Sequence, residues 1–142
     1  MQAKLALREA VQFTAMSGSG HQLTIDGPAE SGGENAGPRP MELVLMGTAG
    51  CTAYDVVTIL RKARQNVTHC DITADAVRAN GVPAVFESIH FSFVVRGADL
   101  DPKKVERAIT LSAEKYCSAS IMLQRAGVTV THSFEIIEEP GA

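Results

Sequence analysis

The chain has 142 residues, of which 45% are hydrophobic and 20% charged, and its formal net charge is −3 at pH 7. This length predicts a single domain over residues 1–142 that can bury a sizeable core. The small net charge, with both signs scattered along the chain, argues against nucleic acid or an anionic membrane as a main partner. The N-terminus lacks the charged-then-apolar pattern of a signal peptide, so we expect a cytoplasmic protein.

The first part of the chain predicts two β-strands and a loop. Residues 2–16 alternate between apolar and polar side chains, which is the period of a strand. Residues 17–20 are typical of a turn, and residues 21–26 alternate again, so the two strands are expected to form a hairpin. Residues 27–38 are rich in Gly, Pro, Ser and Glu without apolar periodicity, which indicates a mobile loop.

Residues 39–65 predict the helix around which the rest of the chain is organised. Pro40 suits the first helical position, and Glu42 favours the positive end of the helix dipole. Nearly every other side chain is apolar or small, which is typical of a helix buried on all sides. A membrane span is not expected, because Glu42 and Asp55 interrupt the apolar run. The few remaining elements cannot cover such a helix, so we expect a two-fold homodimer.

The remaining elements predict an α+β fold with a mainly antiparallel sheet around this helix. Alternating side chains indicate three further strands, over residues 67–78, 85–96 and 128–137. Two helices are expected before the last strand, over residues 102–116 and 121–126. Asp101 and Pro102 mark the start of the first of these, as N-cap and first-turn residues. Gly127 is typical of the residue that ends the second.

Three cysteines are an odd number for a secreted disulfide framework. In a reducing compartment such residues are more often buried hydrophobes, redox groups or metal ligands. Cys51 lies in the middle of the central helix, among small residues. Cys117 lies where one helix stops and the next begins, and a thiol at a helix N-terminus can have a lowered pKa. Periodicity leaves both between an inert and a reactive role, whereas Cys70, in a strand, is best explained by packing.

Two motifs around these cysteines resemble those of the OsmC/Ohr family, which groups osmotically inducible and organic hydroperoxide resistance proteins. The first is PMEL at residues 40–43 leading to GCT at residues 50–52, and the second is EKYCSASIML at residues 114–123. The order of the expected elements is similar over nearly the whole chain. The resemblance implies an OsmC-like fold in an intertwined homodimer, with a central helix pair and active sites at the subunit interface.

The resemblance also implies a two-cysteine peroxidase mechanism without a bound cofactor. In the peroxidase members the first cysteine attacks the peroxide, and the second converts the sulfenic acid to a disulfide that an external dithiol reduces. These roles would fall on Cys51 and Cys117. An apolar pocket that includes Met41 and Met46 would favour an alkyl hydroperoxide over hydrogen peroxide. We therefore expect reduction of organic hydroperoxides in oxidative-stress defence.

The sequence departs from the peroxidase members near the thiolate, which needs support because burial raises the pKa of a thiol. Those members have a Glu directly after the Pro and a matching Arg in the early strands, whereas Met41 follows Pro40 here. Glu42 would lie about half a turn round the helix from Cys51, and it also suits a capping box. Glu42 and Arg39 are thus the candidate supporting residues. The Pro-x-Glu spacing is typical of a broader OsmC-like branch.

Two other functions remain open from the sequence. The same dimer could bind a small apolar or thiol-bearing ligand without catalysis, or act as a redox sensor. The histidines could join Cys51 and Cys117 in a metal site, although no pair has zinc-like spacing. These histidines are His21, His69, His90 and His132. Asp55, one turn from Cys51, is expected to be structural.

Overall fold

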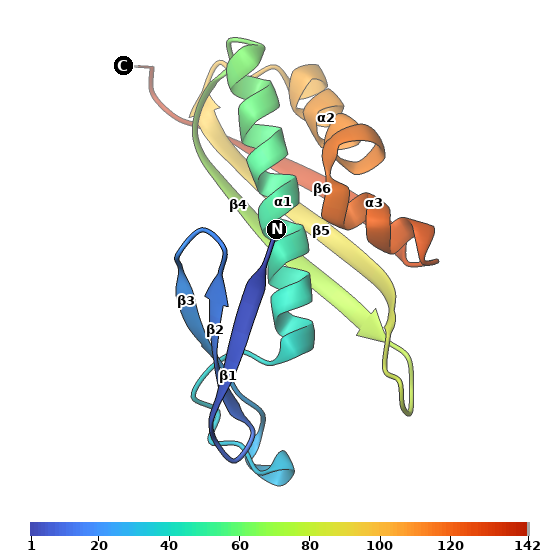
Figure 1. The fold of residues 1–142 in the computed structure, drawn as a ribbon. Helices are drawn as coiled ribbons and strands as arrows, with labels where there is room; N and C mark the ends of the chain where they lie inside the picture. Colours follow the sequence, from blue (N-terminus) through green and yellow to red (C-terminus); the bar gives the residue numbers. More distant parts are fainter. Residues whose placement is uncertain (142) are drawn as a thin grey trace. The chain divides into compact units, whose positions relative to one another are not determined.

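The computed structural model describes residues 1–141, which form two compact units, one of residues 1–44 and one that begins at Leu45. The first unit contains a three-stranded antiparallel sheet (Figure 1). Its elements are β1 (Ala3–Glu9), β2 (Gln12–Ser17), β3 (Gln22–Ile25) and a short 3-10 helix (Ala29–Ser31). The strands follow one another across the sheet in chain order, so the connections between them are short.

Two strands take the place of the single strand expected over residues 2–16, so that prediction was wrong. The chain reverses at Ala10, whose φ of 45° lies in the left-handed region, and Leu7 pairs with Phe13 across the turn. Alanine rarely adopts this conformation, and no Gly or Pro marks the reversal. The hairpin expected around residues 17–20 is confirmed, because Met16 of β2 pairs with Gln22 of β3.

The buried carboxylate of Asp26 organises the loop that follows β3. Asp26 is 2% exposed and accepts hydrogen bonds from the backbone N–H groups of Gly27, Glu34 and Ala36 at 2.8–3.1 Å. Gln12 Nε2 donates a fourth at 3.3 Å. These donors, chiefly the N–H groups of Ala36 and Gly27, lower the pKa of Asp26 from 3.8 to about 2. The loop that the sequence indicated as mobile is therefore tied to one side chain.

The second unit contains another three-stranded sheet, in the order β4-β5-β6. Its elements after the long helix are β4 (Asn66–Arg78), β5 (Phe86–Ala98), α2 (Pro102–Leu111), a π turn (Ser112–Tyr116), α3 (Ser118–Arg125) and β6 (Thr129–Glu138). β4 and β5 are antiparallel, whereas β5 and β6 are parallel and are joined by the helical crossover that parallel strands need. The predicted start of α2 is confirmed, because Asp101 Oδ1 accepts a hydrogen bond from the Lys103 N–H at 2.9 Å.

The hydrophobic core of this unit lies between one face of the sheet and the helices that cover it (Figure 1). β5 contributes alternate side chains, as its sequence predicted, and these are Ile89, Phe91, Phe93 and Val95. The helices contribute Val56, Leu60, Val105, Ala108 and Ile109. All nine side chains are at most 2% exposed. The molecule is thus an α+β protein with two mostly antiparallel sheets and a long helix, which confirms the predicted fold class.

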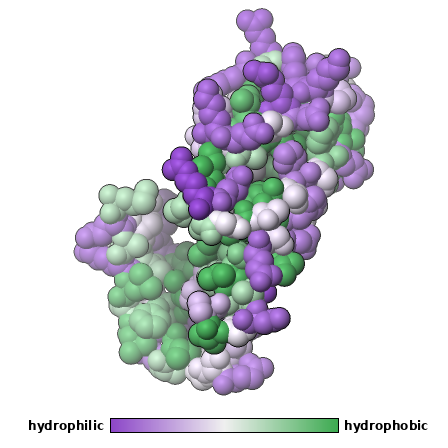
Figure 2. Space-filling view, turned by 90° about the vertical axis from the view of Figure 1, so that its right-hand side faces the viewer, coloured by the Kyte–Doolittle hydropathy of each residue, from purple (hydrophilic) through white to green (hydrophobic). Residues whose placement is uncertain are grey.

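The long helix α1 (Pro40–Lys62) buries only one face within the chain. The buried residues are Thr48, Thr52, Val56 and Leu60, spaced four apart along that face. Other apolar positions stay exposed, such as Met46 at 59% and Tyr54 at 73%. Figure 2 shows hydrophobic residues over wide areas of the surface on the side that it presents. By length and composition α1 could cross a membrane, although the core helix of a soluble protein meets the same criteria.

Candidate functional site

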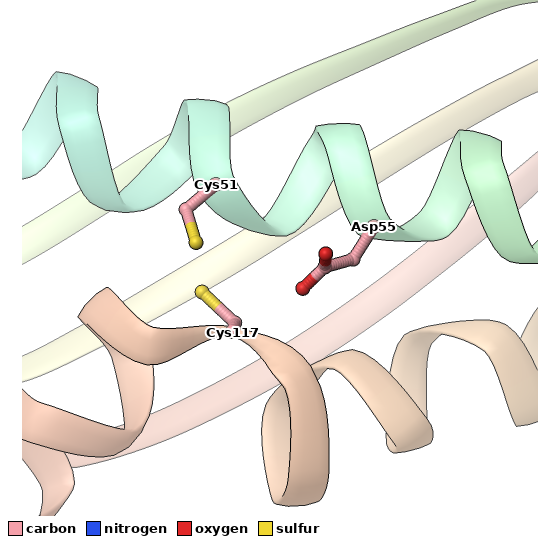
Figure 3. A group of neighbouring side chains, drawn as sticks. All are labelled: Cys51, Asp55 and Cys117. Atoms are coloured by element: carbon pink, nitrogen blue, oxygen red, sulfur yellow. The ribbon is translucent and has the colours of Figure 1, made fainter.

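The structure brings Cys51 and Cys117 together, although they are far apart in the sequence. Cys51 lies in the middle of α1, and Cys117 directly precedes α3. Their sulfur atoms lie within 4.8 Å of one another, and both cysteines are free. Figure 3 shows the two side chains pointing toward each other across the space between the two helical segments. Two thiols at this separation can form a disulfide after a small movement, since a disulfide bond is about 2.05 Å long.

Local structure fixes the position of Cys117. The π turn ends there, and the backbone leaves the helical conformation with φ −74° and ψ 97°. The Cys117 sulfur then caps α3 by accepting a hydrogen bond from the Ser120 N–H at 3.3 Å. The Thr52 hydroxyl lies 3.3 Å from the same sulfur and donates to the Thr48 carbonyl. Either atom of this pair can be the donor, so the Thr52 hydroxyl can turn to donate to the sulfur when Cys117 is ionised.

Burial dominates the electrostatics of Cys117. This residue is 0% exposed, and the loss of water raises the pKa of its thiol. Hydrogen bonds from Thr52 and Ser120 oppose the rise, and the neighbouring Cys51 adds to it. The sequence had suggested a lowered pKa from the helix N-terminus, and that suggestion was wrong. Eight residues make α3 a short helix, whereas the burial of the sulfur is complete.

Asp55 is the third residue of this site. It lies one helical turn after Cys51 on α1, and a carboxylate oxygen lies within 4.8 Å of both sulfurs (Figure 3). Its Oδ2 accepts a hydrogen bond from the Ser112 hydroxyl at 3.1 Å. From its sequence position, Asp55 was expected to be structural. The four-residue spacing from Cys51 was the available signal that both side chains share a face of α1.

Arg39 and Glu42 pair with each other at the start of α1, in the first unit. The Arg39 N–H donates to Glu42 Oε2 at 2.9 Å, and Arg39 Nη1 lies 3.2 Å from Glu42 Oε1. The N–H donor, with help from the Arg39 side chain, lowers the pKa of Glu42. This is the bond expected of a capping box. Cys51 and Cys117 belong to the second unit.

The histidines do not join the cysteines. Among residues 1–141, Cys51, Asp55 and Cys117 are the one group of three or more side chains gathered closely enough to hold a metal ion, and it contains no histidine. His90 instead bonds two hydroxyls of β6, with 2.7 Å from its Nδ1 to Thr131 Oγ1 and 3.0 Å from its Nε2 to Ser133 Oγ. The metal site of Cys and His that the sequence left open is therefore not formed in the described residues.

A surface hollow of about 360 Å³ is lined partly by residues that neighbour Cys117 in the sequence. It is lined by Lys115, Tyr116, Ser118, Ile121, Met122 and Arg125. The expected apolar pocket was to include Met41 and Met46, but neither residue lines this hollow. Met46 is 59% exposed, and Met41 belongs to the first unit. Its lining combines apolar side chains with two cations, a mixture that the sequence analysis did not foresee.

Fold and site together define a protein of the class in which paired cysteines meet beside a long helix of an α+β domain. Comparison with known families agrees, because the model of the OsmC-like protein family matches residues 32–133. Protein YhfA of Escherichia coli is 45% identical over 137 residues, which cover 96% of this chain and 98% of that protein. The chain belongs to the OsmC-like family.

Solved structures show the same fold. A hypothetical protein from Aquifex aeolicus is 30% identical, with a TM-score of 0.85 over 98% of this chain and 97% of that one. The organic hydroperoxide resistance protein OhrB of Bacillus subtilis is 22% identical, with a TM-score of 0.62 over 95% of this chain and 98% of that one. The likeness to OhrB concerns the fold, since its sequence is far more distant than that of YhfA.

Proposed function

We propose that this protein reduces organic hydroperoxides through Cys51 and Cys117, as part of a defence against oxidative stress. The observation that carries the proposal is the approach of the two sulfurs to within 4.8 Å in a protein whose third cysteine, Cys70, is in a strand elsewhere. Membership of the OsmC-like family and the fold shared with a hydroperoxide resistance protein support a stress-related role.

The proposed reaction balances over three steps. The Cys51 thiolate attacks the peroxide, so an S–O bond forms, the O–O bond breaks, and the leaving alkoxide takes a proton to become an alcohol. The Cys117 thiolate then attacks the Cys51 sulfur, and hydroxide leaves as water with one further proton. An external dithiol finally supplies two electrons and two protons, which restore both thiols while the dithiol becomes a disulfide.

The exposures favour Cys51 as the attacking residue and Cys117 as the resolving one. Cys51 is half-buried and can be approached by a substrate, whereas Cys117 is fully buried. The raised pKa of Cys117 also disfavours its thiolate at neutral pH, so it suits the second step better than the first.

We also propose that the protein acts as a homodimer built on α1. Gly47 and Gly50 lie on the face of α1 opposite to its buried residues, and a Cβ added at either glycine would meet nothing within 4 Å. Met46 and Tyr54 flank this small-residue face and are exposed. A second copy of the helix could approach closely there and cover both large side chains.

The direct test follows the consumption of cumene hydroperoxide by the reduced protein with a dithiol reductant. Cys51→Ser should reduce the rate to that of a protein-free control. Cys117→Ser should form a sulfenic acid in place of the disulfide and turn over more slowly, because the external dithiol must then reduce the sulfenic acid directly. Cys70→Ser should behave as wild type and serves as the matched control. Full activity of Cys51→Ser would refute the proposal.

A second candidate function is non-enzymatic, as a binding protein or redox sensor. Asp55 favours it, because the charged side chain that lies within 4.8 Å of both sulfurs is a carboxylate and not a cation. Mass spectrometry after one equivalent of hydroperoxide separates the two functions. A Cys51–Cys117 disulfide formed within one mixing time supports catalysis, whereas slow oxidation without turnover by dithiol supports a sensor.

A further inference from the structure

Two thiols and a carboxylate lie close together at the cysteine pair, and these are groups that bind metal ions. The sulfurs of Cys51 and Cys117 and a carboxylate oxygen of Asp55 all lie within 4.8 Å of one another. Cys51 and Asp55 share one face of α1, and Cys117 approaches from the segment before α3 (Figure 3). The second unit contains all three, so the set is complete within one compact part of the chain.

The spacing of these atoms fits a small thiophilic cation. With zinc–sulfur bonds of about 2.3 Å and zinc–oxygen bonds of about 2.0–2.2 Å, tetrahedral ligands are roughly 3.5–3.8 Å apart. The three atoms therefore need to move by no more than roughly 1 Å to bind a shared ion. Thiolates select zinc and similar ions over magnesium or calcium, which prefer oxygen ligands. Three protein ligands leave the fourth tetrahedral position open.

Neighbouring groups hold the ligands in place, as outer-shell partners do in metal sites. The Ser112 hydroxyl donates to Asp55 Oδ2 at 3.1 Å, which leaves lone pairs of the carboxylate for an ion. The Ser120 N–H donates to the Cys117 sulfur at 3.3 Å. Donors of this kind stabilise negative charge on the ligands without occupying the space between them. Cys51 and Asp55 are only partly buried, so an ion has a route to the site.

We propose that Cys51, Asp55 and Cys117 bind one divalent, thiophilic transition-metal ion per chain, with zinc as the natural choice. Two thiolates and a carboxylate contribute three negative charges, which a divalent cation offsets in large part. Binding of the ion occupies both sulfurs. The metal-bound protein therefore cannot form the Cys51–Cys117 disulfide, and the site holds either an ion or a disulfide. This last consequence rests on the proposed function, but the metal site itself does not.

The experiment titrates the reduced, metal-free protein with Co²⁺, in the absence of any peroxide. We expect one Co²⁺ per chain, thiolate-to-cobalt charge-transfer absorption in the near ultraviolet, and displacement by Zn²⁺. Cys51→Ser and Cys117→Ser should each remove most of this absorption. Asp55→Asn keeps the shape and the bond to Ser112, and it should weaken binding by at least about tenfold. Cys70→Ser should bind as wild type.

A measurement on the wild-type protein covers the case in which a variant fails to fold. Zinc should protect the half-buried Cys51, but not the half-buried Cys70, from alkylation mapped by mass spectrometry. Cobalt binding without thiolate absorption, equal affinity in Asp55→Asn, or equal alkylation with and without zinc would each overturn the proposal. Because no peroxide or reductant is present, a failed metal site leaves the hydroperoxide assay unaffected, and the reverse also holds.

Discussion

Asp26 shows how one residue can fix a loop that composition alone suggests is mobile. Its carboxylate accepts hydrogen bonds from three backbone N–H groups and from the side-chain amide of Gln12, and it is nearly inaccessible to solvent. A buried carboxylate is tolerated when its lone pairs are satisfied in this way. Burial opposes the ionised form, but the hydrogen bonds outweigh burial and the pKa falls to about 2.

This lowered pKa predicts an acid-sensitive contribution to stability. Because the pKa of Asp26 is lower in the folded than in the unfolded chain, its contribution is present above about pH 4 and is lost as the pH falls toward 2. Asp26→Asn should lower the urea midpoint at neutral pH and flatten its decline in acid, as followed by circular dichroism. Glu30→Gln, at an exposed carboxylate of the same loop, is the control. An unchanged acid profile in Asp26→Asn would contradict this role.

Thr52 is the second residue whose effect can be predicted, because its hydroxyl opposes the rise in the pKa of Cys117. Thr52→Val preserves the shape and removes that hydroxyl, so the pKa of Cys117 should rise further. At a fixed neutral pH, the Cys51–Cys117 disulfide should then form severalfold more slowly, and the rate should recover as the pH is raised. Thr58→Val, on the same helix, is the control. Mass spectrometry of samples quenched at successive times measures the rate of disulfide formation. A slower rate that does not recover at higher pH would show that the substitution acts through altered packing instead.

At the scale of elements, α1 combines a buried face with an exposed face of small residues. A single chain gains nothing from glycine on that second face, since Gly in a helix is less favourable than Ala by about 1 kcal/mol. The proposed dimer accounts for Gly47 and Gly50, because in it another helix approaches closely and a side chain would prevent that approach.

Gly50→Leu distinguishes a dimer from a monomer through the sign of its effect. In a monomer, the substitution should raise stability by roughly 0.5–1 kcal/mol, because it removes a helical glycine in open space. In the proposed dimer it should weaken association by at least about tenfold, which is about 1.4 kcal/mol. Light scattering after size exclusion reads the outcome. Lys104→Leu, an exposed substitution on α2, controls for the added hydrophobic surface.

Elements with strong local signals were predicted well from the sequence, and those that depend on distant contacts were not. The cap at Asp101 and the alternation in β5 are local, and both are confirmed. The reversal at Ala10 was missed because the residue adopts a left-handed conformation without Gly or Pro. The parallel pairing of β5 with β6 depends on a crossover that periodicity does not specify.

The candidate site followed the same rule. The two cysteines were identified from their motifs, whereas the place of Asp55 beside both sulfurs became visible only when α1 and the Cys117 segment were seen together. The pKa of Cys117 was misjudged because a helix terminus can be recognised in the sequence, but complete burial of a sulfur cannot. Sequence thus locates reactive groups more reliably than it locates their surroundings.

For the molecule as a whole, the first 44 residues contain no buried apolar side chain, and Asp26 is the one buried residue among them. β1 is exposed along its whole length, with Leu5 and Leu7 about 60% accessible. Three strands without a covered face are not stable in water by themselves. A newly synthesised chain that remained a monomer would expose hydrophobic surface and an unpaired strand edge to other chains. In the proposed dimer, early association of two copies would protect the chain from aggregation before it reacts with any substrate.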